Sequence, residues 1–140
     1  MVYNGYMSVD SNTSLAEKLG LAPGMHVVLV NAPDDFESLL NPLPREISFD
    51  DALKPNAPYI HFFTTSKKDL GDSFPDLKTH LSPTGMLWIS WPKGSSGQQT
   101  DLNENDVRQI GLKNGLVDVK ICSIDDTWSG LKFVFRLRDR

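Results

Sequence analysis

The stretch "MHVVLV", residues 25–30, is a nearly unbroken apolar run that contains several β-branched valines. A strand with one face in water alternates apolar and polar side chains, whereas a strand buried on both faces reads as a continuous apolar run. Two further runs of this kind are "YIHFFTT" at 59–65 and "MLWISW" at 86–91. The three runs predict central strands of a parallel sheet that is covered on both faces.

Helical patterns alternate with these runs. A capping box at 14–17 precedes the first run, and a short helix is expected at 34–40 after it. Between 66 and 81 the apolar residues recur at spacings of three and four, which predicts one helical face, although Pro75 is expected to break or kink this helix. A further helix is expected over 101–114.

The last part of the chain has a different pattern. The segments "VDVKICSI" (117–124) and "LKFVFRLR" (131–138) alternate apolar and polar residues, as strands with one solvated face do. The short connection between them predicts an antiparallel hairpin. Together with a short strand at 45–49, the pattern predicts an α/β fold: an open, mostly parallel Rossmann-like sheet of about six strands, with helices on both faces and a C-terminal antiparallel hairpin.

Composition limits the classes of partner. A chain of 140 residues with 39% hydrophobic and 23% charged residues fits one globular domain, expected over 14–140, after a flexible arm at 1–13. The net charge of −4 argues against nucleic acid or an anionic membrane as the main partner. No signal peptide and no apolar run of about 18 residues occurs, so we expect a cytoplasmic protein.

Several segments carry a resemblance to a known fold. "LAEKLGLAPGMHVVLV" (15–30), "LSPTGMLWISW" (81–91) and "KNGLVDVKIC" (113–122) resemble the first and later strands, with their lead-ins, of class I methyltransferases. The resemblance implies a methyltransferase-like fold and S-adenosylmethionine as the cofactor. It also implies that Asp50 or Asp51 stands where the ribose-binding acid of that family stands.

The turn after the first strand departs from the methyltransferase pattern. Where that family has an acidic residue and a glycine-rich turn, this chain reads Asn31-Ala32-Pro33-Asp34-Asp35, without glycine. Glycine lets the backbone approach a cofactor closely, and proline removes a backbone donor. We therefore do not assign a cofactor, and a divergent S-adenosylmethionine-dependent methyltransferase stays as an alternative.

Two motifs carry a closer resemblance. Trp91-Pro92-Lys93 follows a central strand, and Thr127-Trp128-Ser129-Gly130-Leu131 lies in the last hairpin. Both resemble motifs of a bacterial family of short proteins of unknown function that look like trimmed methyltransferase-like domains. The match spans roughly residues 14–138, and it implies a fold without implying a reaction.

The segment "WPKGSSGQQTDLNEND" at 91–106 looks at first like a phosphate-binding loop. It lacks the Gly-Lys pair of a P-loop, and its helix start carries its own acids. Asp101 is expected to cap that helix, with Glu104 three residues later. We expect a flexible surface loop, with a mobile lid over a nearby pocket as the alternative.

Candidate ligand-binding residues gather where the predicted strands end, the edge at which open α/β sheets bind ligands. They are Asn31, Thr64, Ser66, Lys67, Trp91, Lys93, Asp126 and Trp128. The segment 64–68 offers hydroxyls, helix N–H groups and lysines, which suit an anion. The alternatives are an ordinary helix cap at Ser66, and a tryptophan pair with a Lys–Asp salt bridge that locks the hairpin.

No residue pattern identifies a catalytic or metal site. Cys122 has no histidine nearby in the sequence and is expected to be structural, and the histidines lack partners at metal-ligand spacing. We therefore expect a non-catalytic protein that binds a small anionic ligand or a protein partner at the carboxyl edge of the sheet. The remaining alternative is a structural protein with a homo-oligomeric role.

Overall fold

The computed structural model describes residues 13–140. The predicted arm at 1–13 lies, apart from Thr13, outside the described residues. The strands are β1 (His26–Val30), β2 (Ser48–Asp50), β3 (Ala57–Phe63), β4 (Leu81–Pro92), β5 (Leu116–Ser123) and β6 (Trp128–Phe135). The helices are α2 (Leu15–Lys18), α3 (Phe36–Leu39), α4 (Lys67–His80) and α5 (Glu104–Lys113), with 3-10 turns at Gly94–Ser96 and Leu137–Asp139.

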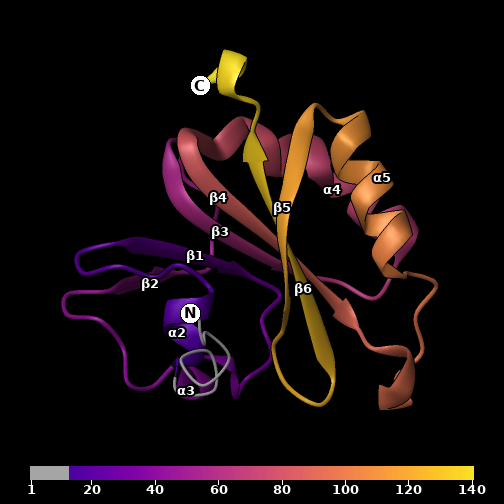
Figure 1. Cartoon of the computed structure of the whole chain (residues 1–140), viewed down its shortest axis with the longest axis horizontal. Coiled ribbons are helices and arrows are strands. Elements are labelled where there is room, and N and C mark those ends of the chain that lie inside the picture. The colour runs from indigo at the N-terminus through magenta and orange to yellow at the C-terminus, as the bar shows by residue number, and fades with distance from the viewer. Residues whose placement is uncertain (1–12) are drawn as a thin grey trace, which may run out of the picture.

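The six strands form one sheet in the order β2-β1-β3-β4-β6-β5. The four strands from β2 to β4 are parallel, and β6 lies antiparallel between β4 and β5. Figure 1 shows the sheet running diagonally between two groups of helices. The predicted fold class, a mostly parallel sheet that ends in an antiparallel hairpin, is confirmed.

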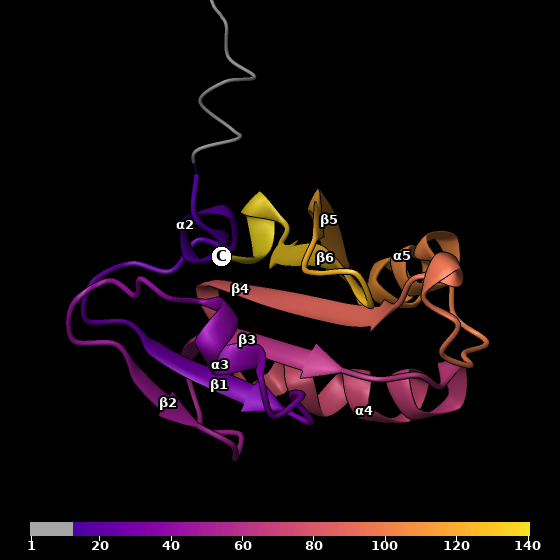
Figure 2. The same ribbon diagram turned by 90° about the horizontal axis from the view of Figure 1, so that it is seen from below.

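The sheet separates two hydrophobic cores. On one face α4 and α5 bury Phe74, Leu77 and Val107 against strand residues such as Phe133. On the other face α2 and α3 bury residues that include Leu19 and Phe36. Figures 1 and 2 show α4 on the side of the sheet opposite to α2. Helices on both faces explain why the central strands read as continuous apolar runs.

The helix α4 passes through Pro75 without a break, so the predicted break is wrong. Leu70, Phe74 and Leu77 are buried along one face of the helix, and this burial holds the helix in place. Pro75 itself is exposed, and the carbonyl that loses its hydrogen-bond partner belongs to exposed Gly71. Water can therefore satisfy that carbonyl.

Two other boundaries differ from the sequence prediction. The strand β4 begins at Leu81, five residues before the predicted run at 86–91. Here the backbones approach closely, because a Cβ added to Gly85 would lie 2.9 Å from the carbonyl O of Ala57. The N-cap of α5 is Asn103, whose side chain accepts a hydrogen bond from the N–H of Asp106, and not Asp101.

Candidate functional site

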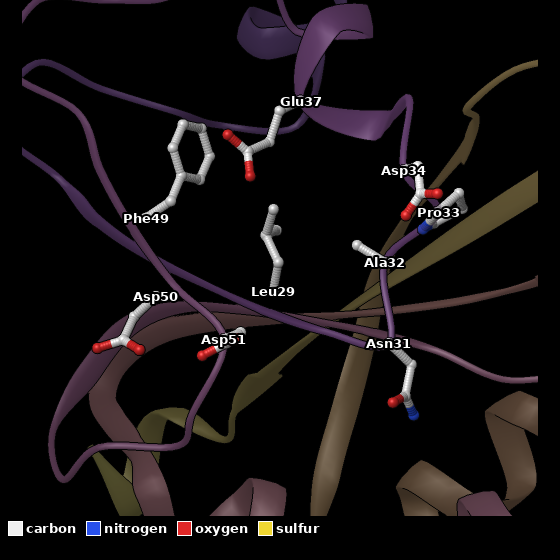
Figure 3. A pocket seen from close by; sticks show the side chains of 9 residues that line it. All are labelled: Leu29, Asn31, Ala32, Pro33, Asp34, Glu37, Phe49, Asp50 and Asp51. Atoms are coloured by element: carbon white, nitrogen blue, oxygen red, sulfur yellow. The ribbon is translucent and has the colours of Figure 1, made fainter.

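A pocket of about 570 Å³ opens at the carboxyl ends of β1 and β2. Its lining comes from the end of β1, the loop that follows, the start of α3 and the end of β2 (Figure 3). The lining residues are Leu29, Asn31, Ala32, Pro33, Asp34, Glu37, Phe49, Asp50 and Asp51. The pocket opens at the edge of the sheet where the sequence predicts ligand binding, and of the candidate residues Asn31 lines it.

The loop after β1 owes its shape to Asn31. This residue has a φ of 61°, in the left-handed region that glycine favours and that asparagine tolerates better than most other residues. The chain can therefore turn sharply out of the sheet without a glycine. Pro33 follows and offers no N–H, so backbone donors are sparse here.

Carboxylates dominate the charge of the pocket. Four lining residues are acidic, and none is Lys, Arg or His: the acids are Asp34, Glu37, Asp50 and Asp51. In Figure 3 the carboxylate of Glu37 turns toward Leu29, across the pocket from Asp50 and Asp51. The apolar part of the lining includes Leu29 and the ring of Phe49.

The four acids differ in how far they are already paired. The Asp50 carboxylate lies 3.1 Å from Nζ of Lys54 and accepts a hydrogen bond from the N–H of Ala52 at 3.2 Å. The hydrogen bond from Lys54 is the main cause that holds the pKa of Asp50 below its usual value. Within residues 13–140, the side chains of Asp34, Glu37 and Asp51 make no hydrogen bond or ion pair. These three carboxylates are thus free to accept hydrogen bonds from a ligand.

The segment 64–68, expected to bind an anion, already holds carboxylates of the chain. Asp101 accepts a hydrogen bond from the backbone N–H of Lys67 at 2.7 Å, and Nζ of Lys67 lies 3.5 Å from Asp106. Thr64 Oγ1 donates to Asp69 at 2.9 Å. The Ser66 hydroxyl accepts from the N–H of Asp69, which is the predicted helix cap. None of Thr64, Ser66 and Lys67 lines the pocket.

The two tryptophans lie on opposite faces of the sheet. Trp91 pairs with Ser129, and its neighbour Pro92 pairs with Trp128, so the two indoles are one residue out of register. Trp91 packs in the core under α4 and α5, whereas Trp128 packs against the other core, with its ring edge-on to Phe63 at 5.3 Å. The tryptophan pair considered from the sequence is therefore not formed.

Hydrogen bonds of Lys93 and Asp125, and not the expected Lys–Asp salt bridge, hold the last hairpin in place. The Lys93 N–H donates to the carbonyl of Thr127 at 2.7 Å, and Nζ of Lys93 donates to Ser123 Oγ at 2.6 Å. Asp125 accepts from the N–H groups of Thr127 and Trp128 at 2.9 and 2.8 Å. The exposed Asp126 makes no ion pair within the described residues. The hairpin is thus closed by hydrogen bonds.

Three hydrogen-bonded side chains, Tyr59, His61 and Ser90, form a buried polar chain on the face of the sheet that α3 covers. His61 is fully buried, with Nε2 at 2.7 Å from Ser90 Oγ and Nδ1 at 3.2 Å from the hydroxyl of Tyr59. Burial lowers the pKa of His61 to about 3, so its ring is neutral. The sequence placed His61 in an apolar strand but offered no signal for its partners. These hydrogen bonds give both ring nitrogens of His61 a partner, and Tyr59, His61 and Ser90 are all buried from solvent.

Two expectations concerned reactive or metal-binding groups. Cys122 is buried, and burial raises the pKa of its thiol, so a structural thiol fits its surroundings. Across residues 13–140 no three His, Cys, Asp or Glu side chains gather in a way that could hold a metal ion. Over the same range, no helix has the length and apolar character needed to cross a membrane.

Comparisons with known proteins agree with this architecture. The family model described as "Protein of unknown function (DUF3052)" matches residues 16–137. No curated protein matches the sequence.

Solved methyltransferases share the fold at low sequence identity. An S-adenosylmethionine-dependent methyltransferase from Aquifex aeolicus is 13% identical, with a TM-score of 0.61 and coverage of 84% of this chain and 85% of that chain. Magnesium protoporphyrin IX methyltransferase from Synechocystis PCC 6803 with bound S-adenosylhomocysteine is 14% identical, with a TM-score of 0.60 and coverage of 92% and 82%. The same enzyme with bound S-adenosylmethionine is 12% identical, with a TM-score of 0.57 and coverage of 92% and 78%. These identities establish the fold alone.

Proposed function

This chain belongs to the DUF3052 family of proteins of unknown function, and on that premise we propose that it binds a small cationic or hydroxyl-rich molecule in its acidic pocket. S-adenosylmethionine is the first candidate. The proposal replaces the anionic ligand expected from the lysines, because neither Lys67 nor Lys93 lines the pocket.

One observation carries the proposal: the unpaired carboxylates of Asp34, Glu37 and Asp51 face a cavity without a basic lining residue. Like charges in one cavity repel each other and would repel an anion, whereas a cation or a hydroxyl donor relieves that repulsion. A ligand pocket also needs apolar surface, which Leu29 and Phe49 supply.

S-adenosylmethionine fits these demands. Its sulfonium carries a positive charge, its ribose carries two hydroxyls that can donate to carboxylates, and its adenine can pack on apolar side chains. The pocket lies at the carboxyl ends of parallel strands, where open α/β sheets bind nucleotides. Two solved structures of similar fold bear S-adenosylhomocysteine and S-adenosylmethionine.

We propose binding rather than methyl transfer. The loop 31–35 has no glycine, and Pro33 has no N–H, so the backbone offers few donors to the ligand. Side-chain carboxylates would then carry most polar contacts to the ligand.

Isothermal titration calorimetry tests the proposal. We expect saturable binding of S-adenosylmethionine. S-adenosylhomocysteine, whose sulfur carries no charge, should bind about fivefold more weakly, because one partly exposed ion pair contributes up to about 1 kcal/mol. Asp51→Asn should weaken binding, whereas Asp35→Asn, which removes the same charge outside the pocket, should not. The absence of heat with both adenosyl compounds and with adenosine would exclude a nucleoside ligand.

A second candidate function is self-association. The edge strand β5 exposes Val119 at 54% and Ile121 at 49%. An edge strand carries unpaired backbone groups that can pair with another chain. Multi-angle light scattering would detect a dimer, and Ile121→Lys should abolish it. A monomeric mass at high protein concentration would remove this candidate.

A further inference from the structure

Two lysines face each other across the terminal hairpin. Lys120 of β5 is the direct partner of Lys132 of β6 in the antiparallel register. Directly opposite side chains in such a pair have Cβ atoms about 4.5–5.5 Å apart, and like charges in these positions destabilise the sheet. The protein has more acidic than basic residues and a net charge of −4, yet no acid stands opposite either lysine in this pair.

Both lysines lie on the face of the sheet that α2 covers. Lys132 also pairs with Trp88 of β4, and Nε1 of Trp88 donates to the carbonyl of Leu19, just after α2, at 2.9 Å. Nζ of Lys120 donates to the carbonyl of Lys18, the last residue of α2, at 2.7 Å. A third lysine, Lys18, therefore borders the same patch.

None of the three ammonium groups forms an ion pair with an acid of residues 13–140. The ammonium groups of Lys18 and Lys132 make no hydrogen bond or ion pair, and Lys120 contacts a neutral carbonyl. Burial, and then the charge of Lys120, lower the pKa of Lys132. Burial raises the pKa of the Cys122 thiol, two residues after Lys120 on β5, against the opposing charges of Lys120, Lys18 and Lys93. The local field is thus positive.

We propose that Lys18, Lys120 and Lys132 form a binding site for a multiply charged oxyanion of the phosphate class. An anion between the opposed ammonium groups converts their repulsion into two charge-assisted contacts. Lysine is a compact point charge with rotatable donors, which suits phosphate oxygens. This lysine patch shares no residue with the acidic pocket, so it would hold a separate ligand or ligand group.

The choice of phosphate over a carboxylate follows from charge. Three ammonium groups that pair with no acid of residues 13–140 are better neutralised by an anion with two or more charges than by a single carboxylate. Lys132 is half-buried, so its attraction to an anion is screened less than that of a fully exposed lysine.

Amide-resolved NMR titration with inorganic phosphate and pyrophosphate tests the site. Sodium chloride at matched ionic strength controls for screening, and acetate tests a single carboxylate. We expect saturable shift changes at 18–20, 119–122 and 131–133, with pyrophosphate binding more tightly than phosphate. Acetate should not saturate.

Variants separate the site from general charge. Lys132→Met and Lys120→Gln should each weaken pyrophosphate binding by about fivefold or more. Lys113→Gln, a matched loss of an exposed lysine on α5, should leave binding unchanged, and amide spectra report whether each variant keeps the fold. Shift changes that chloride reproduces, or that survive in the Lys120→Gln/Lys132→Met double variant, would overturn the proposal. Saturation by acetate as tight as by phosphate would overturn the phosphate class.

Discussion

Asp101 accepts a hydrogen bond from the backbone N–H of Lys67 at the first turn of α4, with a distance of 2.7 Å between Oδ1 and N. A carboxylate from the loop before α5 therefore occupies the place where an external anion would bind the N-terminus of α4. We therefore expect a ligand in the acidic pocket and not at the lysines of 64–68.

The same contact predicts a stability effect. Asp101→Ala should lower the free energy of unfolding by about 1 kcal/mol, because a helix N-terminus loses both a hydrogen-bond acceptor and a favourable negative charge. Urea denaturation measures this change. Asp126→Ala removes an exposed acid that makes no ion pair within residues 13–140 and should have almost no effect. Equal losses in the two variants would contradict the assigned role of Asp101.

Gly111 of α5 packs directly against the ring of Phe133, and a Cβ added at Gly111 would overlap that ring. Because Phe133 is fully buried, the ring cannot move aside cheaply. Gly111→Ala should therefore destabilise the fold by about 1–3 kcal/mol, despite the better helix propensity of alanine.

Gly71 is the matched control for Gly111. It lies in α4, and an added Cβ there would meet nothing within 4 Å. Gly71→Ala should stabilise by up to about 1 kcal/mol through helix propensity alone. Thermal denaturation of both variants distinguishes the signs, and a stabilising Gly111→Ala would show that α5 does not lie against Phe133.

The buried polar chain predicts a loss of stability on removal of one member. Ser90→Ala leaves Nε2 of fully buried His61 without its partner and should cost about 1–3 kcal/mol. Ser95→Ala, an exposed serine in the 3-10 turn, serves as the control. A small effect of Ser90→Ala on the urea midpoint would indicate that water reaches the site.

The same histidine predicts a pH dependence. Burial lowers the pKa of His61 from 6.5 to about 3, so the unfolded chain binds a proton there at a higher pH than the folded chain does. The contribution of His61 to stability should thus be complete above about pH 6.5 and decrease as the pH falls toward 3, by up to about 1.4 kcal/mol per pH unit.

A double variant isolates this dependence. His61→Leu/Ser90→Ala removes both partners of one hydrogen bond and keeps the other histidines. The free energy of unfolding of the wild type, relative to that of the variant, should fall between pH 6.5 and 4.5. Parallel curves for the two proteins in that interval would show that His61 is not buried as described.

Asn31 predicts a backbone requirement at the pocket. At its φ of 61° glycine is free of strain and a β-branched residue is not. Asn31→Gly should leave stability within about 1 kcal/mol of wild type, whereas Asn31→Val should cost about 1–2 kcal/mol. Calorimetric melting of the two variants gives the comparison, and a tolerated valine would contradict the left-handed turn.

The sequence predicted strands and faces well where burial determines the pattern. The run at 59–65 overlaps β3, which is buried on both faces, and the alternation at 117–124 overlaps β5, an edge strand that exposes Val119, Lys120 and Ile121 in succession. Boundaries set by tertiary contact could not be predicted. Both Asp101 and Asn103 could cap α5 by sequence. In the structure Asn103 is the cap, and Asp101 instead accepts a hydrogen bond from the distant N–H of Lys67.

From the sequence we could predict the edge of the sheet at which the pocket opens, but not the set of residues that line the pocket. Asn31 and the acids at 50–51 follow strand ends, and a sequence reader can place them there. Glu37 and Phe49 join them only through the packing of α3 and the pairing of His26 with Ser48. Trp91 and Trp128 are likewise one residue out of register in the β4–β6 pairing, so their side chains lie on opposite faces of the sheet.

The central claim is that the acidic pocket binds an adenosyl compound, and amide-resolved NMR tests it most directly. On titration with S-adenosylmethionine we expect saturable shift changes at residues 29–37 and 49–51, with weaker binding in Asp51→Asn but not in Asp35→Asn. Shift changes confined to the lysine patch of Lys18, Lys120 and Lys132, or none at all with saturating ligand, would contradict it.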